Sequence, residues 1–172
     1  NTWDTSSVTT MEGMFNRNVA FNQPLNNWDT SSVTNMSYMF SAGSYYSYGT
    51  SENTYDNYNV QTAFNQDISS WNTSSVIDMG AMFLGTAAFN QDISSWNTFS
   101  VTNMNSMFAS TTAFNQPLDA WDTSNVTDMS SMFESAAAFN QPLNSWDTSN
   151  VTNMNSMFSE AAVFDQALST WD

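Results

Sequence analysis

The stretch that decides the fold is FNQPLNNWDTSSVTNMSYMF, residues 21–40. Most of it returns as FNQDISSWNTSSVIDMGAMF at 64–83 and as FNQPLNSWDTSNVTNMNSMF at 139–158. Tryptophan gives the register, because consecutive tryptophans lie 25, 43, 25, 25, 25 and 25 residues apart. The long interval is one 25-residue repeat plus an insertion of 18 residues. A fixed period of this length predicts a repeat architecture.

One 25-residue unit cannot bury its own apolar residues, whereas stacked units can. We therefore expect residues 1–172 to form a single solenoid of about six to seven coils, with no separate domain. In each unit, the apolar residues of VTNMSYMF (33–40) have the spacing of one face of a short helix or 3-10 turn. A short parallel strand is expected near residues 25–30, paired between coils at about 4.8 Å.

In such a stack, one position of the repeat becomes a column in space. We expect the tryptophans and the first Met of each Met-x-x-Met-Phe motif to fill the core. These residues are Trp28, Trp71, Trp96, Trp121, Trp146, Met36, Met79, Met104, Met129 and Met154. The alternative reading of the twelve methionines is an adaptable Met-rich binding groove.

Charge and composition narrow the function classes. The chain carries one basic residue, Arg17, against sixteen Asp and Glu, and its net charge is −15. This charge argues against nucleic-acid binding, which needs basic side chains to release counterions. No apolar run is long enough for membrane insertion. The chain has no His, Lys or Cys to act as base or nucleophile, so we expect a protein that is not an enzyme and holds no cofactor.

The pattern W-D-T-S-x-V-T-N-M-x-x-M-F, followed by A-x-x-F-N-Q-x-L, resembles the repeat of BspA-like leucine-rich-repeat surface proteins. The resemblance covers nearly the whole chain except the insertion at 41–63. It implies a leucine-rich-repeat-like α/β solenoid, extracellular or on the cell surface, that adheres to other proteins or surface glycans. It implies no catalytic residues. Because the chain starts at Asn1 without a signal peptide, we expect a mature product or an excerpt of a longer array.

One acidic column follows the tryptophans and is a candidate for calcium binding. Stacked carboxylate oxygens can bridge Ca²⁺, and this is the only metal that the sequence suggests. The alternative is a solvated acidic stripe whose side chains cap turns. The candidate ligands are Asp4, Asp29, Asp122, Asp147 and Asp172.

Other columns are polar but neutral. The Asn and Gln of each F-N-Q motif suggest amide ladders along the stack, with ligand contact as the alternative. The Thr column after the acidic column leaves ice binding as a further alternative. Four Asn-x-Ser/Thr sequences are possible glycosylation sites: Asn35, Asn72, Asn125 and Asn150.

The repeat is interrupted once, by SAGSYYSYGTSENTYDNYNVQTA at 41–63. Insertions in solenoids form loops, often on the binding face, and a mixture of Tyr, Ser, Gly and Asn is typical of antibody contact loops. The alternative is a tolerated insertion that folds over a coil. The contact-loop candidates are Tyr45, Tyr46, Tyr48, Glu52, Tyr55, Asp56 and Tyr58.

These observations favour a structural or adhesive module at the cell surface or outside the cell, which binds other proteins or glycans. A second hypothesis comes from the ends of the chain, NTWD and STWD, which have the same phase and no obvious polar cap. Open ends of this kind permit copies to stack head to tail into an extracellular filament. A third hypothesis is a glycan- or calcium-dependent ligand-binding module.

Overall fold

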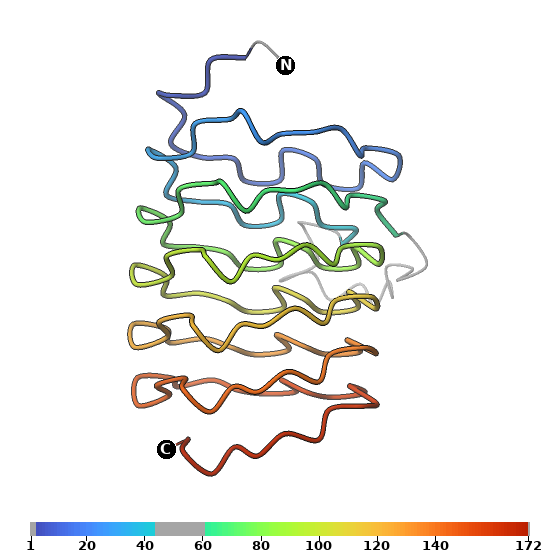
Figure 1. Cartoon of the computed structure of the whole chain (residues 1–172), viewed down its shortest axis with the longest axis vertical. Coiled ribbons are helices and arrows are strands. Elements are labelled where there is room, and N and C mark those ends of the chain that lie inside the picture. The colour runs from blue at the N-terminus through green and yellow to red at the C-terminus, as the bar shows by residue number, and fades with distance from the viewer. Residues whose placement is uncertain (1–2, 44–60, 172) are drawn as a thin grey trace, which may run out of the picture.

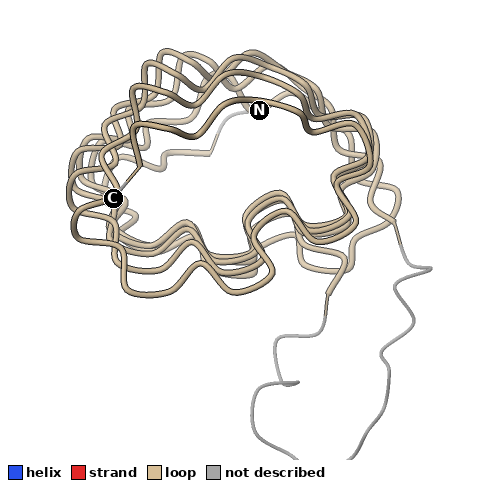
Figure 2. Cartoon of the chain, turned by 90° about the horizontal axis from the view of Figure 1, so that it is seen from below, coloured by secondary structure: helices blue, strands red, loops and turns tan. Residues whose placement is uncertain are grey.

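The computed structural model describes residues 3–43 and 61–171. The chain winds in successive coils that stack along the longest axis, and its two ends lie at opposite ends of the stack (Figure 1). Seen along the stack, the coils overlie one another (Figure 2). We define a coil as the segment from one tryptophan to the residue before the next. Residues 3–27 are then the N-terminal coil, and residues 146–170 are the C-terminal coil.

The described backbone contains neither a helix nor a strand. Among the described residues, β-type pairing between coils is limited to isolated parallel bridges in one column: Thr10 with Asn35, Asn35 with Asp78, Asp78 with Asn103, Asn103 with Asp128, and Asp128 with Asn153. The strand expected near residues 25–30 is not formed, because Trp28 N–H turns back to the Leu25 carbonyl at 3.0 Å. The assignment to the leucine-rich-repeat-like class stays a prediction.

The helical segment expected at 33–40 is also absent, and the hydrogen bonds give the reason. Met39 N–H makes a tight turn to the Met36 carbonyl at 3.3 Å, but Tyr38 N–H leaves the coil and donates to the Gly80 carbonyl at 2.9 Å. Tyr38 has a φ of 57°, a left-handed conformation that cannot continue a right-handed helix. Alternate N–H groups of residues 36–42 therefore bond the next coil: Met36 to Asp78, Tyr38 to Gly80, Phe40 to Met82, and Ala42 to Leu84.

The core consists of columns that run through the stack. All five central tryptophans and four of the five methionines named above are at most 5% exposed. The remaining one, Met154, is half-buried, because it lies in the C-terminal coil. Two columns of Phe rings stack beside the tryptophans, and Phe40 and Phe64 illustrate their contact at 3.8 Å between ring centroids.

Polar groups inside the stack are bonded from coil to coil. The Nε1 of Trp71 donates to the Leu25 carbonyl at 3.1 Å, and the next four tryptophans repeat this bond. The Thr column is buried, and Thr30 Oγ1 donates to the Asn72 carbonyl at 2.9 Å. A buried Thr column cannot order surface water, so ice binding on these residues is excluded. The F-N-Q amides form ladders, as the Gln91 Nε2 bond to Asn65 Oδ1 at 2.8 Å shows.

Candidate contact surface

The acidic column is exposed, and its carboxylates bond their own turns. Asp29 Oδ1 accepts hydrogen bonds from the hydroxyl of Ser31 at 2.6 Å and from Ser31 N–H at 3.0 Å. Both bonds lower the pKa of Asp29 below its ordinary value, and the bond from the Ser31 hydroxyl has the larger effect. Asn72 Oδ1 accepts the same two bonds from Ser74. The column therefore holds turns together whether its members are charged or neutral.

The calcium candidates occupy equivalent turns. Asp4, Asp122 and Asp147 each accept a bond from the Ser two residues on, and Asp172 lies outside the described residues. In residues 3–43 and 61–171, no three His, Cys, Asp or Glu side chains gather closely enough to hold a metal ion. Calcium dependence stays a prediction.

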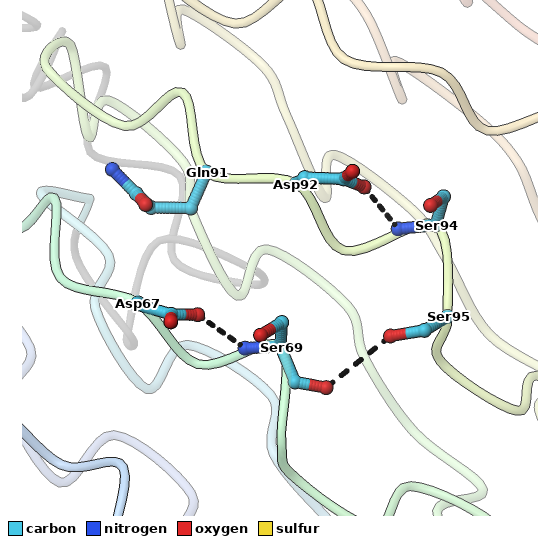
Figure 3. A pocket seen from close by; sticks show the side chains of 6 residues that line it. All are labelled: Asp67, Ser69, Gln91, Asp92, Ser94 and Ser95. Atoms are coloured by element: carbon cyan, nitrogen blue, oxygen red, sulfur yellow. Dashed lines mark hydrogen bonds between the residues drawn. The ribbon is translucent and has the colours of Figure 1, made fainter.

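A shallow polar hollow of about 280 Å³ opens between two middle coils (Figure 3). Asp67 and Asp92, one coil apart, lie along it, and each accepts a bond from the N–H of the Ser two residues on, at 2.9 and 3.0 Å. The pKa of Asp67 is lowered by the Ser69 N–H and then its hydroxyl, and that of Asp92 by the Ser94 hydroxyl and then its N–H. Both carboxylates are thus ionised at neutral pH and can accept hydrogen bonds from a polar ligand.

Two large apolar side chains are exposed in the middle of the stack. Ile77 is 48% exposed and Phe99 is 57% exposed. They belong to adjacent coils, because the Ile77 carbonyl accepts a 2.9 Å bond from the N–H of Thr102, three residues after Phe99. The other exposed large apolar residues of the described chain all lie in or next to the end coils: Trp3, Met14, Val19 and Val163. We call Ile77 and Phe99 the apolar pair.

Three overlapping segments, 1–61, 49–122 and 93–172, match one family model, described as Mycoplasma protein of unknown function, DUF285. The chain belongs to the DUF285 family. No curated protein and no solved structure matches it. The three matches together span the whole chain, in agreement with a tandem-repeat protein.

Sequence reasoning missed the apolar pair and the hollow, although each departs from the DUF285 repeat of this chain. Ile77 stands where other coils have Thr, and Phe99 stands where they have Ser. Asp67 and Asp92 replace the Pro found at positions 24, 117 and 142. The seven contact-loop candidates between Tyr45 and Tyr58 lie outside the described residues.

The four candidate glycosylation sites differ in how their side chains are used. Asn35, Asn125 and Asn150 each donate a hydrogen bond from Nδ2, to the Glu12 carboxylate, the Phe99 carbonyl and the Ser124 carbonyl. A glycan on any of these nitrogens would sit directly at a bond between coils. Asn72 is exposed and bonds through its oxygen instead, so it is the site where a glycan disturbs the stack least. None of the described residues forms a helix that could cross a membrane.

Proposed function

We propose that this DUF285 chain is a non-enzymatic adhesive module, extracellular or on the cell surface, built on a leucine-rich-repeat-like solenoid. The resemblance of its repeat to BspA-like surface proteins supports the location and the role. The observation that carries the proposal is the apolar pair, because Ile77 and Phe99 break columns that are polar in the other coils.

The apolar pair suits contact with a partner. Aromatic and aliphatic side chains bury large areas, and such anchors carry much of the binding energy of protein interfaces. The stack holds both residues in place through its backbone, as in the bond between the Ile77 carbonyl and Thr102 N–H. A preorganised anchor loses little conformational entropy on binding.

The charge of the chain and the polar hollow favour a polar or basic partner. The net charge of −15 attracts positively charged surfaces and speeds their encounter. The hollow beside Asp67 and Asp92 adds ionised acceptors, which suit the hydroxyl groups of a glycan as well as the amides of a protein. We therefore propose an extracellular protein or a surface glycan as the ligand.

The experiment restores the repeat at both positions of the pair. The variant Ile77→Thr with Phe99→Ser is compared with the wild-type chain on immobilised matrix proteins, a glycan array and whole cells. We expect binding to fall at least tenfold, with an unchanged melting temperature, because both side chains are exposed. The matched control is Thr127→Ser with Ser124→Ala, which changes the same two positions in the next coil along and should leave binding intact.

Two further variants test whether the hollow or the Tyr-rich insertion, and not the apolar pair, is the contact surface. Asp67→Asn with Asp92→Asn removes the charges of the hollow, and deletion of residues 44–60 removes the Tyr-rich insertion. If the pair variant binds like the wild type and the deletion variant does not, the insertion is the contact site and the apolar pair is not. Loss of binding only in the double Asn variant would assign the ligand to the hollow.

A further inference from the structure

The acidic column that follows the tryptophans loses its charge in the two coils of the apolar pair. Its members in the four middle coils are, in order, Asp29, Asn72, Asn97 and Asp122. The hydroxyl of the threonine after each of the first three donates to the carbonyl of the next member, at 2.9, 2.9 and 2.8 Å. Ile77 lies in the coil of Asn72, and Phe99 lies in the coil of Asn97. The pair therefore lies in the neutral part of the column, and a carboxylate lies one coil beyond it in each direction.

The turn that contains Asp122 lies against the backbone of Phe99. Ser124 donates its N–H and its hydroxyl to Asp122 Oδ1, at 3.0 and 2.6 Å. The next residue, Asn125, donates from Nδ2 to the Phe99 carbonyl at 2.8 Å. Both bonds to the carboxylate use Oδ1, and the side chain is exposed. Asp122 thus presents its second oxygen to a ligand that covers Phe99.

A second column carries carboxylates just after the apolar pair along each coil. We call it the bridge column, because its members are joined by the isolated parallel bridges. Asp78, which directly follows Ile77, belongs to it, as does Asp128 two coils later. Both aspartates are half-buried. Asp78 Oδ1 accepts hydrogen bonds from Gly80 N–H at 2.8 Å and from Asn103 Nδ2 at 3.0 Å.

The chain supplies no cation to these carboxylates. Arg17, its only basic residue, lies in the N-terminal coil, where its N–H bonds the Ser41 carbonyl. An apolar centre with a charged rim is the anatomy of protein interfaces, in which charged residues are depleted at the core. A rim of one sign selects a partner of the opposite sign. We call the following four residues the rim carboxylates: Asp29, Asp78, Asp122 and Asp128.

We propose that the ligand of the apolar pair is a protein segment in which Lys or Arg flanks an aromatic side chain. The aromatic ring covers Ile77 and Phe99. The basic side chains pair with Asp29 and Asp122, which are three coil steps apart, about 14 Å at the spacing of paired strands. An extended segment rises about 3.3 Å per residue and turns alternate side chains to one face. Basic residues two positions before and two positions after the aromatic residue therefore match this span.

The inference rests on the proposed function, because it takes the apolar pair as the contact surface. It selects a protein segment over a neutral glycan as the ligand. A neutral glycan brings hydroxyl groups but no cation, so it would cover the rim carboxylates without pairing their charge. A basic segment supplies both the apolar contact and the opposite charge.

The first test uses the purified chain and the dye-labelled synthetic peptide Lys-Ser-Trp-Ser-Lys, followed by fluorescence anisotropy. One control peptide replaces both Lys by Glu, and another replaces the Trp by Ser. We expect the parent peptide to bind at least tenfold more tightly than either control, and its affinity to fall as the salt concentration rises. A panel of peptides with other spacings between Lys and Trp accompanies it. If no member of the panel binds, the proposal is wrong.

The second test changes the rim. Asp29→Asn with Asp122→Asn removes two charges and keeps the turns, because Asn72 accepts the same turn bonds. We expect the peptide to bind about tenfold more weakly. The matched control, Asp4→Asn with Asp147→Asn, makes the same change in the same column of the two end coils. Both double variants have a net charge of −13 in place of −15, so equal losses of binding would show attraction to the overall charge and overturn the proposal.

Failure of this inference is distinguishable from failure of the proposed function. If Ile77→Thr with Phe99→Ser abolishes adhesion but the wild type binds no basic peptide, the pair is the contact surface and its ligand is of another class. Binding to a neutral glycan that depends on the pair would identify that class. If the peptide binds through the rim carboxylates while adhesion does not depend on the pair, the basic-peptide site stands and the adhesive role is wrong.

Discussion

The Nε1 of Trp96 donates a 3.1 Å hydrogen bond to the carbonyl of Ile68, three residues before the preceding tryptophan, Trp71. Both residues are buried, so the bond joins the tryptophan column to the backbone that leads into Trp71. A shift in the register between coils would leave the indole N–H unsatisfied in the core, at a cost of about 1–3 kcal/mol. The tryptophan column therefore fixes the register as well as filling space.

Trp96→Phe should destabilise the chain more than Trp28→Phe. Both substitutions remove the same atoms from buried rings that stack on other tryptophans. Only the first removes a hydrogen bond, because Trp28 Nε1 has no partner to lose, and the Ile68 carbonyl then keeps only its 3.1 Å bond from the Trp71 N–H. We expect a difference of about 0.5–1.5 kcal/mol in the free energy of unfolding, the net contribution of one hydrogen bond, measured by urea denaturation. Equal losses would show that the bond contributes nothing beyond packing.

Met104→Ala should cost about 2–5 kcal/mol of folding free energy, because Met104 is fully buried and its removal leaves a cavity in the column. Met14→Ala is the matched control, since Met14 is exposed in the N-terminal coil and its loss should cost under about 0.5 kcal/mol. Denaturation curves with equal midpoints for the two variants would contradict core filling by the methionine columns.

The period of the sequence was sufficient to predict stacked units and to place Trp96, Met104 and their counterparts in the interior. It could not predict the path of the backbone within a coil. Residues 33–40 have helical spacing, yet Tyr38 is left-handed and sends its N–H to the next coil. Gly13 fills that left-handed position in the N-terminal coil, but Tyr, Ala and Ser fill it in the later coils, so most repeats carry no local signal for it.

Asp29→Asn should leave stability at pH 7 nearly unchanged, because Asn72 shows that an amide oxygen accepts the same turn bonds. Asp29→Ala should lower the melting temperature, because Ser31 loses its acceptor. In the wild type, the bonds with Ser31 hold the folded-state pKa of Asp29 below its ordinary value of 3.8. This stabilisation is present above pH 3.8 and is lost as the pH falls through the folded-state pKa.

Melting curves of the wild type and the two Asp29 variants, recorded at neutral pH and again well below the ordinary pKa of Asp29, check the acid dependence. The wild type should lose part of its advantage over the Asp29→Ala variant at the lower pH, because the neutral carboxyl is a weaker acceptor than the carboxylate, whereas the advantage of the Asp29→Asn variant should not change. If the gap between the wild type and the Asp29→Ala variant stays constant with pH, the charge of the carboxylate adds nothing to the stability of the turn.

The candidate surfaces could be predicted only in part from the sequence. Repeated positions are easy to recognise, but a substitution within a column is informative only once the exposure of that column is known. Ile77 and Phe99 could be interpreted as contact residues only because the structure shows that both side chains are exposed.

Ser110→Gly should stabilise the chain by about 0.5–1 kcal/mol, because Ser110 has a φ of 56° and a side chain is strained there. Gly85, the residue one coil earlier in the same column, has a φ of 69°, so Gly85→Ala should have the opposite effect, by about 1 kcal/mol. The Ser110 N–H bond to the Glu134 carbonyl at 2.7 Å is a backbone bond and survives the change.

The control for added chain flexibility is Thr112→Gly, at an exposed position that is not left-handed. Glycine there increases the entropy of the unfolded chain without relieving strain, so it should destabilise. Urea denaturation compares the three variants with the wild type. If Ser110→Gly lowers stability as Thr112→Gly does, the left-handed column is not strained, and the serines there are held by contacts worth more than the conformational cost.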